Sequence, residues 1–137
     1  MAIEQITIFL ENRPGRLSRI TSALSESGIP ITAMVLTDTA DFGILHLIVK
    51  ETERALSVLK DQGFAAKKTP VAIVEVKENP QDINRIMMLF READINIEYM
   101  YAFTSQEKNI LVLRYDNLEK GLDILASNGI SIMTGDL

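Results

Sequence analysis

The chain has 137 residues, of which 47% are apolar and 24% charged, with no cysteine and a net charge of −5. These proportions are typical of a globular protein and exclude a disordered or fibrous chain. The lack of cysteine excludes disulfides, thiol catalysis and thiolate metal sites, and the acidic charge disfavours nucleic-acid binding. No apolar run approaches the ~20 residues of a membrane span and no signal-peptide pattern is visible, so we expect a cytoplasmic protein with no membrane contact.

The first half of the chain alternates strand and helix patterns. Dense β-branched and aromatic residues predict a strand over 3–10, which Asn12-Arg13-Pro14-Gly15 breaks. Apolar residues at helical spacing follow and end at Gly28, which suits a helix C-terminus. The remaining predicted elements are a hairpin of strands over 29–37 and 43–49, a helix that Thr52 caps and Gly63 ends, and a short strand over 64–69.

The second half repeats this order of elements. We predict strands over 71–77, 95–103, 108–115 and 130–133 and helices over 81–93 and 118–127. Shifted by 66 residues, the chain matches itself from position 14 to position 63 with fourteen identical residues. Recurring proline, arginine and glycine cannot come from chance matching of apolar side chains; examples are the pairs Pro14/Pro80, Arg19/Arg85 and Gly63/Gly129.

The chain is therefore an internal duplication, and we call residues 1–70 copy one and residues 71–137 copy two. Arg13 is interpreted as one extra residue before Pro14, so that Glu11-Asn12 faces Glu78-Asn79. The order of elements predicts an α+β protein of two ferredoxin-like βαββαβ units, with antiparallel sheets and helices on one face. The second strands look apolar on both faces, which favours a homodimer.

The segment from Leu10 to Leu17 is the strongest candidate for a binding site, because it joins a strand to a helix N-terminus. Free backbone N–H groups and the positive end of the helix dipole suit an anion there. Gly15 lets a ligand approach the backbone, and Asn12 can both donate and accept, as an amino acid requires. Arg13, Arg16 and Arg19 add positive charge that a bound anion would offset. The alternative is a simple turn with solvated arginines.

His46, the only histidine, lies in the middle of a predicted strand. Without a second histidine or a nearby nucleophile, a structural role is favoured over a catalytic one. Arg19 and Arg85 recur at one helix position, which indicates surface structure.

The candidate loop and its surroundings resemble the ACT domain. The matching residues are Glu11-Asn12-Arg13-Pro14-Gly15-Arg16-Leu17, the apolar helix after them, and Gly28-Ile29-Pro30-Ile31. ACT domains are βαββαβ regulatory modules that bind amino acids and control enzymes of amino-acid metabolism. The resemblance covers essentially the whole chain as two units. It implies a stand-alone regulatory protein that is not an enzyme, has no cofactor or metal, and acts in trans on an enzyme partner.

The two copies match the ACT pattern unequally. In ACT pairs the resemblance places the ligand between two units, at the Pro-Gly loop of one and the start of the second strand of the other. Copy two lacks the loop glycine and has Asp82 where copy one has Arg16, but it keeps the strand asparagine, Asn96, where copy one has Pro30. This implies one good site and one degraded site per chain. The implied ligand-binding residues are Asn12, Arg13, Pro14, Gly15, Arg16, Leu17, Ile29, Ile31, Asn96 and Ile97.

Three other classes of function remain in competition. A structural interaction module without a ligand fits the same fold, because this fold hosts many functions. A small hydrolase of ferredoxin-like fold would need an anion loop with a placed asparagine, for which Asn12 and Asn79 are loose candidates. RNA recognition on the sheet is disfavoured by the acidic charge and by the lack of basic and aromatic residues interleaved on a strand.

Overall fold

The structure, a computed structural model, describes residues 3–11, 13–38 and 41–134. These residues form two compact units, Glu4–Thr69 and a second one of residue 3 with residues 70–134. The elements in chain order are β1 (Ile3–Glu11), α1 (Arg16–Glu26), β2 (Ile31–Asp38), β3 (Phe42–Val49), α2 (Thr52–Asp61), β4 (Ala65–Glu75), α3 (Gln81–Glu92), β5 (Ile97–Ser105), β6 (Lys108–Tyr115) and α4 (Leu118–Ser127).

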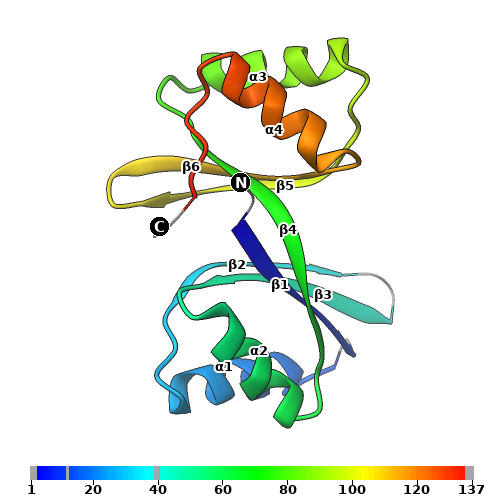
Figure 1. Ribbon diagram of the computed structural model, residues 1–137. Helices are drawn as coiled ribbons and strands as arrows, with labels where there is room; N and C mark the ends of the chain where they lie inside the picture. The colour runs from blue at the N-terminus through cyan, green and yellow to red at the C-terminus, as the bar shows by residue number, and fades with distance from the viewer. Residues whose placement is uncertain (1–2, 12, 39–40, 135–137) are drawn as a thin grey trace. The chain divides into compact units, whose positions relative to one another are not determined.

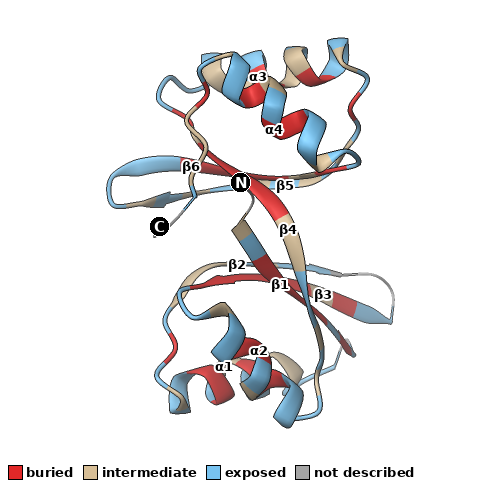
Figure 2. Ribbon diagram, in the orientation of Figure 1, coloured by how far each residue is buried: buried red, intermediate tan, exposed pale blue. Residues whose placement is uncertain are grey.

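Each copy is a two-layer α+β unit, which confirms the predicted fold class. In copy one the strand order is β2-β3-β1-β4, and in copy two it is β5-β6-β4, with antiparallel β1–β3, β2–β3, β4–β6 and β5–β6 pairs. In each unit the two helices cover one face of the strands (Figure 1). Figure 2 shows that the buried positions gather on the strands and on the helix sides that face them.

The two cores occupy equivalent places in the two copies. In copy one, Ile20, Leu24 and Leu59 from the helices join a cluster with β1 and β3; in copy two, Ile86, Phe90 and Leu125 do the same with β4 and β6. Full burial of one such side chain contributes about 1.5–3 kcal/mol. The apolar periodicity therefore places the same helix faces against the same strands twice.

The strand registers correct the predicted extra residue. Ile6 of β1 lies opposite Leu47, and Ala72 of β4 lies opposite Leu113. Both pairs are related by the shift of 66 residues, so the two strands are equivalent without an insertion. Arg13 is then the counterpart of Asn79, because the shift continues through the loop to the Pro14/Pro80 pair.

The four helix ends repeat one motif. Ile29 N–H donates to Leu24 O at 3.0 Å and Ile95 N–H donates to Phe90 O at 2.9 Å, and α2 and α4 end in the same way. These bonds satisfy carbonyls that the helix leaves free. They also hold residues 29 and 95 outside the strands, so β2 and β5 begin two residues later than predicted.

Cations at equivalent positions of the two copies bind to the carbonyls at these helix ends. Arg19 Nη2 donates to Gln62 O at 3.2 Å, and its counterpart Arg85 donates to Asn128 O at 2.6 Å. Lys120 Nζ donates to Ala93 O at 2.7 Å. Cations at helix C-termini complement the dipole. The structural interpretation of Arg19 and Arg85 is therefore confirmed. The Arg19 guanidinium also lies 5.0 Å from the centre of the Phe64 ring.

Three local predictions are wrong. The strands over 64–69 and 71–77 are one strand, β4, because Pro70 fits an extended backbone and removes only one donor; its carbonyl accepts a bond from Arg114 Nη1 at 2.9 Å. Thr52 is the first residue of α2 rather than its cap, and Glu51 holds the N-cap position without a capping hydrogen bond from its side chain. The strand over 130–133 is reduced to a bridge between Val74 and Ile132.

No described helix is long and apolar enough to cross a membrane.

Candidate functional site

The loop at the start of α1 is open at Gly15. This residue is the N-cap of α1 and has a φ of 88°, which L side chains rarely adopt. A Cβ placed there would meet no atom within 4 Å. The glycine is thus required by backbone conformation, and the space above it is accessible to a ligand. Asn12, the predicted donor and acceptor, lies outside the described residues.

The charges of the loop are paired within the chain. Arg13 Nε lies 3.1 Å from Glu11 Oε2, and Arg16 Nη2 lies 3.2 Å from Glu11 Oε1. We expected a bound anion to offset these arginines, but Glu11 already does so in this structure. Arg16 is the better protected partner, because its side chain is 23% exposed against 59% for Arg13.

A cavity of about 340 Å³ adjoins this loop. Ion-pair partners Glu11 and Arg16 line it together with aromatic rings; the full lining is Phe9, Leu10, Glu11, Arg16, Phe42, Gly63, Phe64 and Ala65. Phe9 and Phe42 are about half exposed, at 46% and 54%, although large apolar side chains gain by burial. The volume lies at the lower end of the range typical of small-molecule pockets.

The lining of this cavity suits a zwitterion. A guanidinium binds a carboxylate in a planar, charge-assisted arrangement, and a carboxylate accepts from an ammonium. Arg16 and Glu11 supply these two groups side by side, and the aromatic rings offer an apolar wall. An incoming amino acid would exchange the Glu11–Arg16 pair for two pairs of its own.

Four of the predicted ligand residues belong to a hydrophobic core or pack against one. Ile29 is 5% exposed and belongs to the core of copy one, against which Leu17 and Ile31 also pack. Ile97 packs in the same way against the core of copy two. These side chains hold the loop and the strand start in place. Pro14 is exposed in the loop itself.

Asn96 stands just before β5, and its side chain is exposed. Its backbone is fixed by Asp116, because Asn96 N–H donates to Asp116 Oδ1 and Asn96 O accepts from Asp116 N–H, each at 3.2 Å. Asp94, two residues earlier, has a φ of 57°, where Gly28 of copy one has 66°. The strand start of copy two is therefore held in a defined position.

The loop of copy two is closed by its own carboxylate. Asp82 Oδ2 accepts from both Lys77 N–H and Glu78 N–H at 3.0 Å. Asp82 also lies in the first turn of α3, where a negative charge is favoured by the helix dipole. Copy one has Arg16 at this position. The loop of copy two therefore binds a carboxylate of its own chain, whereas the loop of copy one carries a cation at the equivalent place.

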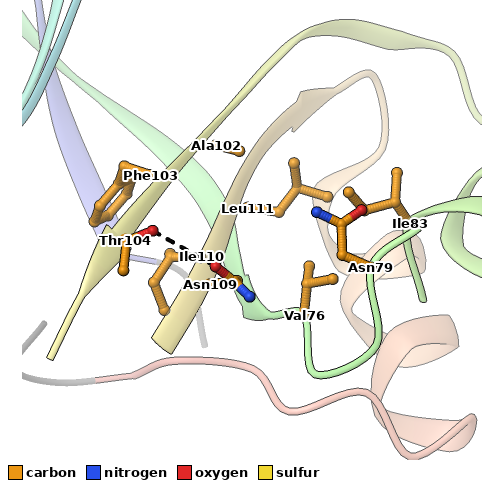
Figure 3. Close-up of a pocket in the computed structure, with 9 residues that line it drawn as sticks. All are labelled: Val76, Asn79, Ile83, Ala102, Phe103, Thr104, Asn109, Ile110 and Leu111. Carbon is orange, nitrogen blue, oxygen red and sulfur yellow. Dashed lines mark hydrogen bonds between the residues drawn. The ribbon is translucent and has the colours of Figure 1, made fainter. Parts of the chain in front are cut away.

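A second cavity, of about 170 Å³, lies in copy two (Figure 3). In this view Asn79 lies on one side of the cavity, on the loop before α3. The Thr104–Asn109 pair lies on the other side, on the β5–β6 hairpin. The full lining is Val76, Asn79, Ile83, Ala102, Phe103, Thr104, Asn109, Ile110 and Leu111. No lining residue is ionisable.

A buried polar cluster lies in copy one on the strand face away from the helices. Gln5 Nε2 lies 3.1 Å from His46 Nδ1, and Thr7 Oγ1 lies 2.9 Å from Thr69 Oγ1. Because an amide nitrogen only donates, Nδ1 of His46 accepts, which requires a neutral ring. Burial lowers the pKa of His46 below its usual value of 6.5. The structural interpretation of this histidine agrees with these contacts.

Sequence reasoning missed the aromatic wall and the internal carboxylate. Phe9 and Phe42 come to the same cavity because β1 pairs with β3 in a register that sets Glu11 opposite Phe42. A single sequence does not specify that register. The signal available for Asp82 was an acidic residue in the first turn of a helix, which is typical of capping.

Among the described residues, no group of three His, Asp or Glu side chains is placed to hold a metal ion.

Comparison with known proteins identifies the same architecture. The family model of the ACT domain pair matches residues 1–136. The solved structure of protein BT0572 from Bacteroides thetaiotaomicron is 32% identical with a TM-score of 0.90, covering 97% of this chain and 92% of that one. The regulatory subunits of aspartate kinase from Thermus thermophilus and Thermus flavus share the fold at 19% and 20% identity. Their TM-scores are 0.63 and 0.61, with 92% and 90% of this chain and 92% and 88% of theirs covered. No curated protein matches the chain significantly.

Proposed function

We propose that this chain, which belongs to the ACT domain pair family, is a regulatory protein that binds an amino acid and acts in trans on an enzyme of amino-acid metabolism. The family supports a regulatory, ligand-binding role and points to a protein without catalytic activity. The amino acid, the action in trans, the homodimer and the cytoplasmic location stay predictions.

The observation that carries the proposal is the Glu11–Arg16 ion pair beside the open Gly15 and the aromatic cavity. In the proposed complex, Arg16 and the N-terminal end of α1 bind the ligand carboxylate, and Glu11 binds its ammonium. Phe9, Phe42 and Phe64 hold the side chain.

We assign a second contribution to Asn96 of an ACT unit that faces this loop, as the resemblance implies. Ligand binding between units couples occupancy to assembly, because a ligand that binds the associated form better shifts the equilibrium toward it. This is the proposed route from amino-acid concentration to an effect on a partner.

A thermal-shift screen of the twenty amino acids tests the proposal. A ligand present at about a hundred times its dissociation constant stabilises the folded state by about 2.7 kcal/mol. We expect a shift with one amino acid or a small related group. No shift with any of the twenty would favour the structural module and contradict the proposal.

Exchanging residues between the copies locates the site. Gly15→Gln introduces the residue that copy two has at the equivalent position, Gln81, and should abolish the shift. The reverse variant, Gln81→Gly, is the matched control and should leave the shift intact. Equal loss in both variants would contradict the assignment to copy one.

Asn96→Ala should weaken amino-acid binding, because it removes the proposed donor and acceptor while leaving the backbone bonds to Asp116 in place. Asn84→Ala, on the exposed side of α3, is its control. Normal affinity of the Asn96→Ala variant would remove this residue from the site.

A further inference from the structure

The cavity of copy two is uncharged although its surroundings are not. Val76 and Leu111 form its apolar floor, and each is at most 3% exposed. The polar groups are the amides of Asn79 and Asn109 and the hydroxyl of Thr104, and Thr104 lies 3.5 Å from Asn109 Oδ1. Amides and hydroxyls both donate and accept hydrogen bonds without carrying charge. An ion entering this cavity would lose hydration without meeting an opposite charge.

The neighbouring carboxylate makes the cavity unsuitable for anions in particular. Asp82 is bound to the N–H groups of Lys77 and Glu78, which lie in the chain between the lining residues Val76 and Asn79. These amides are therefore occupied by an internal carboxylate, and its negative charge stands beside the cavity. A ligand carboxylate would lose these donors and meet a repulsive charge.

The repeat shows that this neutrality is specific to copy two. The three polar lining residues Asn79, Thr104 and Asn109 have Arg13, Asp38 and Gly43 as their counterparts in copy one. Copy two thus has neutral residues in place of Arg13 and Asp38, and an asparagine in place of Gly43. A fourth change creates space, because Ala102 stands where copy one has Leu36.

We propose that this cavity is a second binding site, separate from the amino-acid site of copy one, and that it takes a small uncharged molecule with an apolar body and a carboxamide group. The amides of Asn79 and Asn109 pair with the carboxamide from two sides, and Val76 and Leu111 contact the apolar body. The volume fits a ligand of modest size, since an apolar cavity of about 150 Å³ accommodates benzene. The proposal is independent of amino-acid binding at copy one.

Three probes of nearly equal shape test it: isobutyramide, isobutyrate and isobutylamine, which are neutral, anionic and cationic. Each is titrated at millimolar concentrations into ¹⁵N-labelled full-length protein, and the side-chain amide signals of Asn79 and Asn109 are followed. We expect saturable shifts with isobutyramide and at least about tenfold weaker binding of both ions. No saturable shift with isobutyramide, or equal binding of isobutyrate, would overturn the proposal.

One substitution taken from copy one, with a control on the same strand, sharpens the test. Ala102→Leu fills the space without changing an amide and should abolish the isobutyramide shifts at Asn79 and Asn109. Met100→Leu, two residues away on the same face of β5 but outside the cavity, is the matched control and should bind normally. Binding that survives in Ala102→Leu would place the probe elsewhere and contradict the proposal.

Asp82→Asn separates charge from shape. It removes the negative charge while an amide oxygen can still accept from Lys77 and Glu78 N–H, so isobutyrate should gain affinity relative to isobutyramide. An unchanged preference would contradict the role given to Asp82.

Discussion

Copy one and copy two share a backbone and differ in the chemistry they present. The registers β1–β3 and β4–β6, the helix ends, and the bonds from Arg19 and Arg85 all repeat at a shift of 66 residues. The loops before α1 and α3 differ in charge, and the strand faces away from the helices differ in polarity. The two copies thus keep the interactions that hold the fold and differ in these loops and on these strand faces.

The two cores differ at one contact between a strand and a helix, and a substitution there has the largest predicted effect on stability. Tyr115 is 1% exposed and packs over Gly121 of α4; a Cβ at Gly121 would come closer than 3.0 Å to its ring. Copy one has Val49 and Ala55 at these positions. Gly121→Ala should therefore lower the free energy of unfolding by roughly 3 kcal/mol, measured by urea denaturation.

A double-mutant cycle checks the cause of that loss. In the background Tyr115→Val, which introduces the copy-one partner, Gly121→Ala should cost nothing or stabilise. The matched change in copy one, Ala55→Gly, should cost about 1 kcal/mol through helix propensity and about 0.8 kcal/mol through the loss of a buried methyl group. Additive effects of the two substitutions in copy two would contradict the account of the Tyr115–Gly121 contact.

The buried polar cluster of copy one gives the next effect. Gln5, Thr7 and His46 have Val71, Ile73 and Val112 as their counterparts, so copy two is apolar where copy one is polar. His46→Val removes one acceptor of the Gln5 amide, which keeps its bond to Thr7 Oγ1 at 3.3 Å, and should cost about 1 kcal/mol in denaturant unfolding. The triple variant Gln5→Val/Thr7→Ile/His46→Val should recover most of this loss, because donors and acceptors are removed together. A triple variant that is less stable than the single one would show that the polar cluster itself stabilises the fold.

Substitutions at Asp94 and Gly28 compare the backbone strain at the equivalent helix ends of the two copies. Both have positive φ, at 57° and 66°, a conformation that costs an L side chain about 1 kcal/mol. Asp94→Gly should therefore raise the thermal unfolding free energy by about 1 kcal/mol, and Gly28→Asp should lower it by a similar amount. Changes of the same sign in both variants would contradict this assignment.

The smallest effect is a dependence of stability on pH. Burial lowers the pKa of His46 in the folded protein, so between the two pKa values the unfolded chain binds more protons. The stability that the buried, neutral His46 contributes is fully present above the unfolded pKa of about 6.5. It is lost as the pH falls through the pKa of His46 in the folded protein. Denaturation at a series of pH values should show this loss in the native chain, and a smaller one in His46→Val. An identical pH profile in both proteins would contradict it.

Much of the fold could be predicted because its signals are local or repeated. Helix periodicity, the recurring prolines and glycines, and the loop Asn12-Arg13-Pro14-Gly15 lie within short stretches. The continuity of β4 through Pro70 could not be predicted, since proline alone indicates a break. The Phe9–Phe42 wall and the Gln5–His46 contact depend on strand register, and the residues of that contact are 41 apart in the chain. These contacts therefore depend on how the strands pair in the folded chain, which a single sequence does not specify.

The inequality of the two loops is the central claim, and calorimetric stoichiometry tests it most directly. Isothermal titration of the full chain with the amino acid that gives the largest thermal shift should show one site per chain. Gly15→Gln should then remove that site, and Gln81→Gly should leave it unchanged. Two equal sites per chain would contradict the account, because they would mean that the loop closed by Asp82 binds the amino acid as well as the loop that carries Arg16.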